Sequence, residues 1–346
     1  MNSNSSPSTK PLVSVVTPFY NTAEYLAECI ESVLRQSYDN WEYILLNNCS
    51  TDGSDQIARQ YAAKDSRIRL LSNGTLLPQV QNYNAALSYI SPQSSYCKIV
   101  QADDWIYPEC LERMVGLAEA HPSVGIVSSY SLRGDAVWGL GLPYTVTVTA
   151  GTEVCRLQLT TGLFLFGSPT TVLYRSEIIR KTARFFDQGA LHDDTDACYR
   201  TLRNCDFGFI HQVLSFLRVG NDSITSRVKN FGLWHPDRFL QLTKFGPAYL
   251  EPDELSRLLE AHQTEYYRFL ARRFLVGGSE KFWQYHTSAL ESGGERLEKR
   301  RLLKYACLEL LKLVVNPGFA SVRLYDRFRT SIAGKGKTIE DNQGAR

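Results

Sequence analysis

The sequence has 346 residues, 43% of them hydrophobic and 21% charged, so it is long enough for two domains and too apolar for a disordered chain. Lys and Arg (38) nearly balance Asp and Glu (36), which argues against general nucleic-acid binding because that function needs a concentrated basic face. The balance conceals an asymmetry: residues 1–227 carry 18 basic and 22 acidic side chains, and residues 228–346 carry 20 and 14. This difference indicates two functional regions.

The first strand of the predicted sheet is the β-branched run LVSVVT at 12–17, which is typical of a strand buried on both faces. Further strands, most of them followed by helical spacing, are expected at 41–46, 68–71, 96–100, 125–129 and 207–219. This alternation predicts an α/β fold with a doubly wound, mostly parallel sheet. We place that domain at residues 11–230 and a charged, helical C-terminal extension at 235–330.

The two ends of the chain and the cysteines indicate in which cellular compartment the protein is expected. Residues 1–10 are polar and lack the apolar stretch of a signal peptide, and they are expected to form a disordered leader. Residues 334–346 are expected to form a disordered tail. Eight cysteines without CxxC or zinc spacing suggest free thiols in a reducing compartment, and no apolar run reaches the roughly 18–20 residues of a membrane span. We therefore expect a cytoplasmic protein.

Three polar clusters follow predicted strands: TPFYN at 17–21, NNCSTDGS at 47–54 and QADD at 101–104. In open parallel sheets, ligands bind beyond the carboxyl ends of the strands, so these clusters are expected to share one site. Adjacent carboxylates at Asp103 and Asp104 suit a divalent cation that holds a diphosphate, since Mg²⁺ and Mn²⁺ favour carboxylate and phosphate oxygens. A solvated turn explains the pair equally well.

Two polar clusters, NNCSTDGS and HDDTD, could each be functional, but a purely structural explanation is favoured for each when it is considered alone. The amides and hydroxyls of NNCSTDGS could read a base or a ribose, but they also suit an ordinary turn before a helix. The acids of HDDTD at 192–196 could provide a general base, but acids at the start of a helix also oppose the helix dipole favourably. Neither cluster identifies an activity by itself.

The order and spacing of four blocks are more specific. PLVSVVTPFYN, ILLNNCSTDGS, VQADDWIYP and HDDTDACYR together resemble the family 2 glycosyltransferases of GT-A fold, and the match covers about residues 11–227. The sequence contains neither a GxGxxG motif nor a P-loop, so dinucleotide and P-loop NTPase functions find no support. The resemblance implies a GT-A-like sheet that binds a nucleotide-sugar donor.

The resemblance also implies donor-binding residues. In the family, the end of the first strand packs around the nucleotide base, and the residues at these positions here are Thr17, Pro18, Phe19 and Tyr20. The second strand usually ends in two Asp, one of which contacts the base or ribose, whereas this sequence has Asn47 and Asn48. We therefore expect the neutral amide of Asn48 to take that role. Asn84 lies in a third donor-side segment, QNYNAAL.

The metal and catalytic positions follow in the same way. The family's DADD motif is QADD here, so Gln101 replaces one Asp while Asp103 and Asp104 remain as the expected ligands of Mn²⁺ or Mg²⁺. HDDTD takes the place of the family's ED motif, which implies that Asp194 is the general base beside Asp193. Crowding by Asp193 and by Asp196 is expected to raise the pKa of Asp194. Arg218 matches the late Arg that precedes a loop over the diphosphate.

The implied activity is transfer of a sugar from a nucleotide-diphosphate sugar, with a uridine nucleotide favoured, to an acceptor hydroxyl with inversion. A glycan or a lipid-linked acceptor is expected, and no nucleic acid. Two alternatives remain open: a sugar nucleotidyltransferase, which would need a Gly-rich phosphate loop, and an inactive carbohydrate-binding or scaffold protein. The interleaved basic and apolar residues at 296–315 also suggest peripheral contact of the C-terminal helices with the inner face of a membrane.

Overall fold

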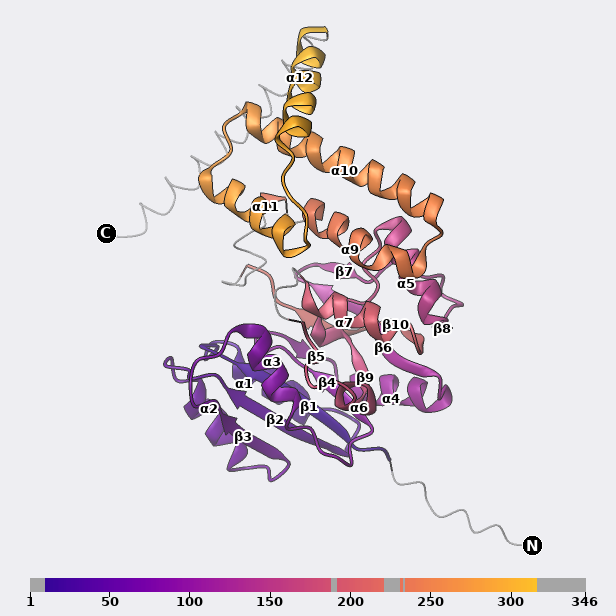
Figure 1. Ribbon diagram of the computed structural model, residues 1–346. Helices are drawn as coiled ribbons and strands as arrows, with labels where there is room; N and C mark the ends of the chain where they lie inside the picture. Colours follow the sequence, from indigo (N-terminus) through magenta and orange to yellow (C-terminus); the bar gives the residue numbers. More distant parts are fainter. Residues whose placement is uncertain (1–9, 188–191, 221–230, 233, 316–346) are drawn as a thin grey trace, which may run out of the picture. The chain divides into compact units, whose positions relative to one another are not determined.

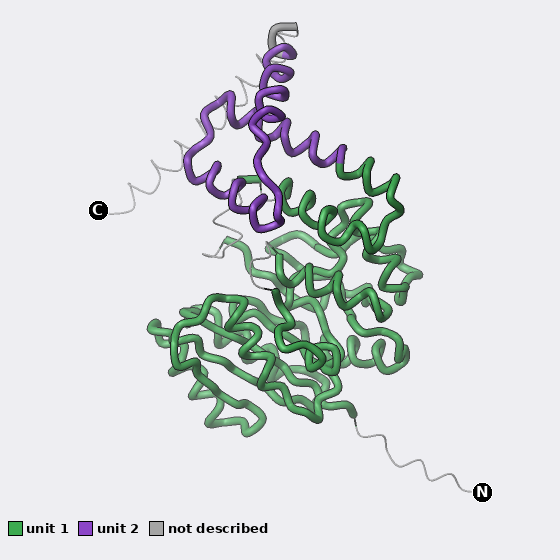
Figure 2. Tube along the Cα trace, in the orientation of Figure 1, with its two compact units in different colours: residues 1–259 green, residues 260–346 purple. Residues whose placement is uncertain are grey.

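The computed structural model describes residues 10–187, 192–220, 231–232 and 234–315. The chain divides into two compact units, unit 1 at residues 1–259 and unit 2 at residues 260–346 (Figure 2). The predicted tail at 334–346, and all of the predicted leader except Lys10, lie outside the described residues.

The first half of unit 1 alternates strands with helices, as the sequence predicts (Figure 1). The elements are β1 (Val13–Phe19), α1 (Leu26–Leu34), β2 (Trp41–Asn47), α2 (Ser54–Ala62), β3 (Ile68–Ser72), α3 (Gln79–Leu87) and β4 (Tyr96–Ile99). β1 pairs in parallel with both β2 and β4, and β2 pairs in parallel with β3. This parallel arrangement brings the carboxyl ends of β1, β2 and β4 to one edge of the sheet.

The second half of unit 1 makes the sheet mixed. Its elements are β5 (Trp105–Ile106), α4 (Cys110–Ala120), β6 (Val124–Arg133), β7 (Ala136–Trp138), β8 (Val148–Thr149), α5 (Gly151–Thr161), the 3-10 turn η1 (Pro169–Thr171), β9 (Leu173–Arg175), α6 (Ser176–Arg180), α7 (Asp193–Thr201), β10 (Asp206–Leu217) and α9 (Trp234–Tyr249). The main order of strands is β3-β2-β1-β4-β9-β6-β10-β5. β6 and β10 are parallel, whereas β9 lies antiparallel between β4 and β6. The predicted fold class, an α/β fold with a mostly parallel sheet, is confirmed.

Alternating residues of the central strands supply two hydrophobic cores, one on each face of the sheet. Val15 of β1 packs in the core that contains residues of α1 and α4, and Val16 packs in the core that contains residues of α3, α5, α7 and α9. Both side chains are almost fully buried, at 0% and 1% exposure. This two-sided burial explains why β1 reads as a continuous apolar run.

Unit 1 extends beyond the boundary at 230–235 that the sequence suggests. The reason is α9, whose Arg238 is buried and donates hydrogen bonds to the main-chain oxygens of Gln158 and Leu159 in α5. Leu242 and Phe245 of the same helix join one of the two cores. The first helix of the predicted C-terminal region is therefore part of the sheet-containing unit.

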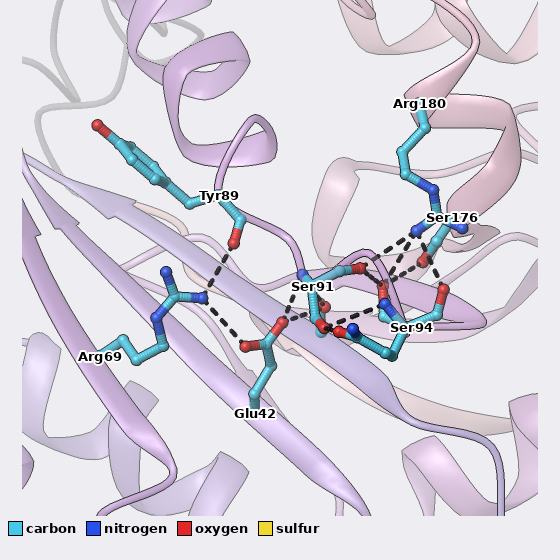
Figure 3. A network of polar contacts seen from close by, with 9 residues as sticks. Glu42, Arg69, Tyr89, Ser91, Ser94, Ser176 and Arg180 are labelled. Atoms are coloured by element: carbon cyan, nitrogen blue, oxygen red, sulfur yellow. Dashed lines mark hydrogen bonds and ion pairs between the residues drawn. The ribbon is translucent and has the colours of Figure 1, made fainter.

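A polar network fastens the 88–95 loop at the amino ends of the strands, opposite the edge described below (Figure 3). The Glu42 carboxylate accepts hydrogen bonds from the Ser91 main-chain N–H at 2.7 Å and from Arg69 at 3.2 Å. Arg180 donates to the main-chain oxygen of Ser94 at 3.1 Å. These contacts fix the loop between α3 and β4. The polar side chains at this edge therefore stabilise the fold.

Unit 2 contains the remaining helices, and α10 (Pro252–Leu275) runs across the division between the units. It is followed by α11 (Glu280–Ser292) and α12 (Lys299–Val315), in agreement with the helical character predicted for this region. Within unit 2, the buried Tyr266 hydroxyl contacts His286 Nδ1 at 2.8 Å, and the Tyr267 hydroxyl accepts the Glu298 N–H at 2.8 Å. These contacts join the carboxyl part of α10 to α11 and to the start of α12.

All eight cysteines are free, as predicted, and five of them are buried. Among the residues that the structure describes, no helix is both long enough and apolar enough to cross a membrane.

Candidate active site

The carboxyl edge of the sheet brings the three predicted polar clusters together. Phe19 at the end of β1 lies opposite Asn47 at the end of β2, and Val16 of β1 lies opposite Ile99 of β4. The loop after β2 then bonds to the loop after β1, because Asp52 accepts the Ala23 N–H at 2.9 Å. The prediction that these clusters share one edge is confirmed.

The four residues at the end of β1 differ strongly in exposure. Thr17 is fully buried, and its hydroxyl donates to the Val100 main-chain oxygen at 2.7 Å. Pro18 and Phe19 are also buried, whereas Tyr20 is 45% exposed. The structure therefore places Thr17, Pro18 and Phe19 in the support beneath the edge and only Tyr20 on its surface.

Asn48 is buried, and its amide is engaged on both sides. Its Oδ1 accepts hydrogen bonds from the Leu77 N–H and from the Asn73 amide, and its Nδ2 donates to the Leu77 oxygen, each at 2.9 Å. Both lone pairs of Oδ1 are thus used within the chain. The side chain holds the 73–77 loop against β2, and its oxygen has no lone pair left to accept from a base.

Restoring the acid that relatives carry is expected to destabilise this chain. Asn48→Asp keeps the two accepting interactions but places a carboxylate against the Leu77 oxygen in a buried position, which should cost about 1–3 kcal/mol. Urea unfolding at pH 7.5 measures the change. The exposed Asn204 provides the control, since Asn204→Asp should leave the unfolding midpoint almost unchanged. A stable Asn48→Asp protein would contradict the proposed role of the amide.

Asn84 likewise serves the fold. Its Oδ1 accepts the N–H groups of Phe185 and Phe186, both at 3.0 Å, and its Nδ2 donates to the Phe186 oxygen at 2.8 Å. These bonds join α3 to the segment that precedes α7. The structure places Asn84 between the two halves of unit 1, where it fixes the chain that leads towards the acidic helix.

Asp104 is 5% exposed, and both of its carboxylate oxygens are occupied. The Thr170 hydroxyl donates to Oδ2 at 2.6 Å, and the main-chain N–H of Arg218 donates to Oδ1 at 2.9 Å. Burial, together with the charge of Asp103, raises the pKa of Asp104 to about 7, and these two hydrogen bonds oppose the rise. Asp104 therefore joins three chain segments beneath the edge.

Arg218 lies against the same turn. Its Nε donates to the Asp103 main-chain oxygen at 2.9 Å, and its guanidinium pairs with the Glu28 carboxylate. The guanidinium also lies over the Tyr25 ring, 4.5 Å from the centroid. The loop that follows Arg218 at 221–230 lies outside the described residues.

A divalent cation fits this turn through one or two carboxylates. Among the described residues, no group of three or more Asp, Glu, His or Cys side chains could hold a metal by itself. Mg²⁺ in particular usually takes only one or two protein carboxylates and completes its shell with substrate phosphates and water. Asp103 is half-buried, and the oxygens of Asp104 accept the hydrogen bonds from Thr170 and Arg218. Asp103 and Asp104 are the residues of this turn that would hold a cation.

The acids of HDDTD open α7, as predicted, but they have different surroundings. Asp196 forms an ion pair with Lys244 of α9 at 2.6 Å, so its charge is compensated. Burial raises the pKa of Asp193 to about 6, and the charge of Asp194 adds to the rise. Burial also raises the pKa of Asp194, while His192 and the hydrogen bond from the Thr195 N–H act in the opposite direction. The rise predicted for Asp194 is present, and burial rather than crowding is its main cause.

Tyr83 is a buried side chain of α3. Burial raises the pKa of Tyr83, and the charges of Asp103 in the QADD turn and of Asp193 at the start of α7 add to the rise.

Sequence reasoning missed three residues of this site. Tyr83 stands directly before Asn84 in the segment QNYNAAL, which the resemblance already links to the donor, so that motif could have identified it. Thr170 lies in a polar turn that carried no comparable signal. Glu28 carried no signal, because an acid in the first turn of a helix is ordinary.

Comparison with known proteins agrees with this geometry. Residues 14–183 match the family described as "Glycosyl transferase family 2". The putative glycosyltransferase EpsE of Bacillus subtilis is 42% identical over 154 residues, which cover 42% of this chain and 54% of EpsE. Glycosyltransferase GlyG of Streptococcus pneumoniae is 28% identical over 197 residues, which cover 55% of this chain and 64% of GlyG. The match therefore spans between about half and two thirds of the length of each of these relatives.

Solved structures share the fold. Residues 1–349 of S. aureus TarS, in complex with UDP-GlcNAc, superpose with a TM-score of 0.58 at 16% identity, covering 84% of this chain and 82% of that one. The mannosyltransferase PcManGT of Pyrobaculum calidifontis, in complex with GDP-Man and Mn²⁺, gives a TM-score of 0.52 at 16% identity, covering 89% and 88%. These likenesses confirm the GT-A type of the α/β fold.

Proposed function

Residues 14–183 belong to glycosyl transferase family 2, and from that premise we propose that the protein transfers a sugar from a nucleotide-diphosphate sugar to an acceptor hydroxyl. The observation that carries the proposal is the presence of two carboxylate clusters, one in the QADD turn that Arg218 contacts at the carboxyl edge of the sheet and one at the start of α7. One cluster suits a cation with a diphosphate, and the other suits proton transfer. A single-displacement transfer with inversion requires both functions on opposite sides of one sugar.

In this mechanism, the donor diphosphate lies beside Asp103 and Arg218. A bound Mn²⁺ or Mg²⁺ would supply positive charge that stabilises the departing diphosphate. Asp104 keeps the turn in place through Thr170 and through the main chain of Arg218. Asp194 takes the proton of the acceptor hydroxyl as its oxygen attacks, and burial of this carboxyl favours its action as a base because the raised pKa strengthens it.

The proposed donor carries uridine diphosphate. The relationship of fold to TarS, whose structure holds UDP-GlcNAc, makes uridine nucleotides the first candidates, and PcManGT with GDP-Man makes guanosine nucleotides the second. A growing glycan is the proposed acceptor, because a further relative is described as a putative teichuronic acid biosynthesis glycosyltransferase, 34% identical over 127 residues. The exposed Tyr20 is the side chain of the β1 end that can contact a base.

Donor hydrolysis without an acceptor tests the activity. The protein is incubated with UDP-GlcNAc, UDP-glucose or GDP-mannose and Mn²⁺, and the free nucleoside diphosphate is measured. Slow release of UDP or GDP that stops in Asp194→Asn supports a glycosyltransferase. When pyrophosphate is added, formation of a nucleoside triphosphate and a sugar 1-phosphate would instead indicate a nucleotidyltransferase. Binding of donor without any release, even with glycan acceptors added, would favour an inactive scaffold.

We also propose that α12 contacts an anionic membrane surface. Its exposed side chains include Leu303 and Leu311, at 54% and 58% exposure, interleaved with the exposed basic residues Arg300 and Lys304. Glu309, the acid of this helix, is buried beside Lys312. An outward surface that is basic and apolar suits an anionic lipid interface.

Vesicle sedimentation tests the membrane proposal. Wild-type protein should sediment with phosphatidylglycerol vesicles at low salt and remain free in the presence of phosphatidylcholine vesicles. The double variant Leu303→Gln and Leu311→Gln should bind several-fold more weakly. Equal recovery of wild-type and variant protein in the supernatant with both lipids would leave α12 without a lipid role.

A further inference from the structure

Arg218 lies at the QADD turn, and its charge is matched by an acid of this chain. In the described part of the chain, the guanidinium contacts four groups: the Asp103 main-chain oxygen, the Tyr25 and Phe216 rings and the Glu28 carboxylate. The first three contacts orient the guanidinium. Among these four groups, the Glu28 carboxylate is the one that places a full negative charge directly on it.

Glu28 belongs to α1, far from Arg218 in the sequence, and its side chain is 56% exposed, whereas that of Arg218 is 23% exposed. An exposed carboxylate on a partly buried guanidinium occupies the position that an incoming phosphate oxygen would take, because Arg binds carboxylate and phosphate through the same planar fork. The two anions therefore exclude each other at this fork. Asp103 and Asp104 add further negative charge beside it, which a diphosphate must also overcome.

We propose that Glu28 competes with the donor diphosphate for Arg218, so that the ion pair holds Arg218 in place between turnovers and opens when the donor binds. The inference rests on the proposed function, since it requires a diphosphate at this turn. It assigns to Glu28 a positioning role that lowers affinity for the nucleotide. The benefit is release of the nucleoside diphosphate product, because Glu28 regains Arg218 as the product leaves.

The expected effect is modest, since exposed ion pairs contribute about 0.2–1 kcal/mol. The upper part of that range corresponds to an affinity for the diphosphate about two- to five-fold higher when the competing charge is removed. The effect should decrease as salt increases, because the competing groups are partly exposed. Its direction is diagnostic: if Glu28 merely preorganised Arg218, its removal would weaken binding.

The test is calorimetry of UDP and of GDP, each with and without Mn²⁺, on the wild type and on Glu28→Gln. Glu31→Gln is the matched control, because Glu31 lies one turn further along α1 and pairs with Arg35 and Tyr61 rather than with Arg218. Arg218→Ala shows how much diphosphate affinity is lost when the guanidinium itself is removed. We expect Glu28→Gln to bind two- to five-fold more tightly, Glu31→Gln to match the wild type, and Arg218→Ala to bind at least tenfold more weakly.

Each other outcome overturns the inference in a recognisable way. Unchanged or weaker binding by Glu28→Gln excludes competition, while diphosphate binding by the wild type leaves the proposed function standing. Equal tightening in Glu28→Gln and Glu31→Gln would indicate general electrostatics rather than competition at the fork. Absence of UDP and GDP binding in the wild type under all conditions would overturn the proposed function, and the inference with it.

Discussion

Asp194→Asn is expected to lower turnover by about 10²–10⁴-fold, which is the usual loss when a general base is removed. The amide keeps the size of the side chain and can still accept the Thr195 N–H that Asp194 accepts at 2.8 Å. It cannot take a proton. Donor binding and melting temperature should therefore stay close to the wild-type values while kcat collapses.

Asp193→Asn and Asp196→Asn are the matched controls for this prediction. Asp196 is paired with Lys244, so its removal should affect stability more than chemistry. Asp193 lies within the electrostatic reach of Tyr83 and is the competing candidate for the base. Turnover that survives within a few-fold in Asp194→Asn, or that disappears in Asp193→Asn alone, would transfer the role of base to Asp193.

The pH dependence of kcat has a definite direction. The base works only when it is ionised, and burial raises the pKa of Asp194, so activity should decline on the acid side at a pH above the usual pKa of a free Asp. His192 lowers the pKa of Asp194. His192→Gln should therefore move the acid limb of the profile to higher pH. If the acid limb does not move, His192 does not influence the pKa of the base.

Asp103→Ala is expected to abolish the effect of Mn²⁺ on diphosphate binding. Losing a direct carboxylate ligand should cost more than the roughly 10–100-fold that loss of an outer-sphere partner typically costs in metal affinity. Asp103 is half-buried, and the hydrogen bond from Arg218 uses its main-chain oxygen, which Ala retains. Calorimetry of UDP at several Mn²⁺ concentrations measures the loss.

Asp104→Asn tests whether Asp104 stabilises the turn rather than binding the metal directly. The amide oxygen can still accept one of the hydrogen bonds that Asp104 receives from Thr170 and Arg218, so the turn should persist. Mn²⁺-dependent binding should weaken by an intermediate amount. If Asp103→Ala retains the full Mn²⁺ effect and Asp104→Asn loses it, the two residues exchange roles.

Much of the fold could be predicted from the sequence because its strands are buried on both faces. Such strands read as continuous apolar runs, and β1 is the clearest example. The antiparallel strand β9 has only three residues, and its place between β4 and β6 depends on long-range pairing that no local pattern encodes. The role of α9 in unit 1 was also hidden, because it depends on Arg238 reaching the carbonyl groups of α5.

The positions of the acidic residues of the candidate site could be predicted from the sequence. The roles of its neutral residues were harder to predict. Asp103 follows β4 at the predicted edge, and Asp194 lies at the start of α7, as the sequence pattern indicates. The sequence does not reveal which amides are already satisfied, so Asn48 and Asn84 suggested donor contacts although both are engaged with the main chain. Hydrogen-bond saturation depends on loops that are distant in sequence, such as 73–77.

The most direct test of the central claim is a calorimetric titration of the wild-type protein with UDP and GDP, with and without Mn²⁺. The account predicts that at least one of them binds at a single site, that Mn²⁺ tightens this binding, and that Asp103→Ala removes the tightening. If neither diphosphate binds with or without Mn²⁺, or if Asp103→Ala leaves the dependence on Mn²⁺ intact, the carboxyl edge of the sheet is not a nucleotide-sugar site.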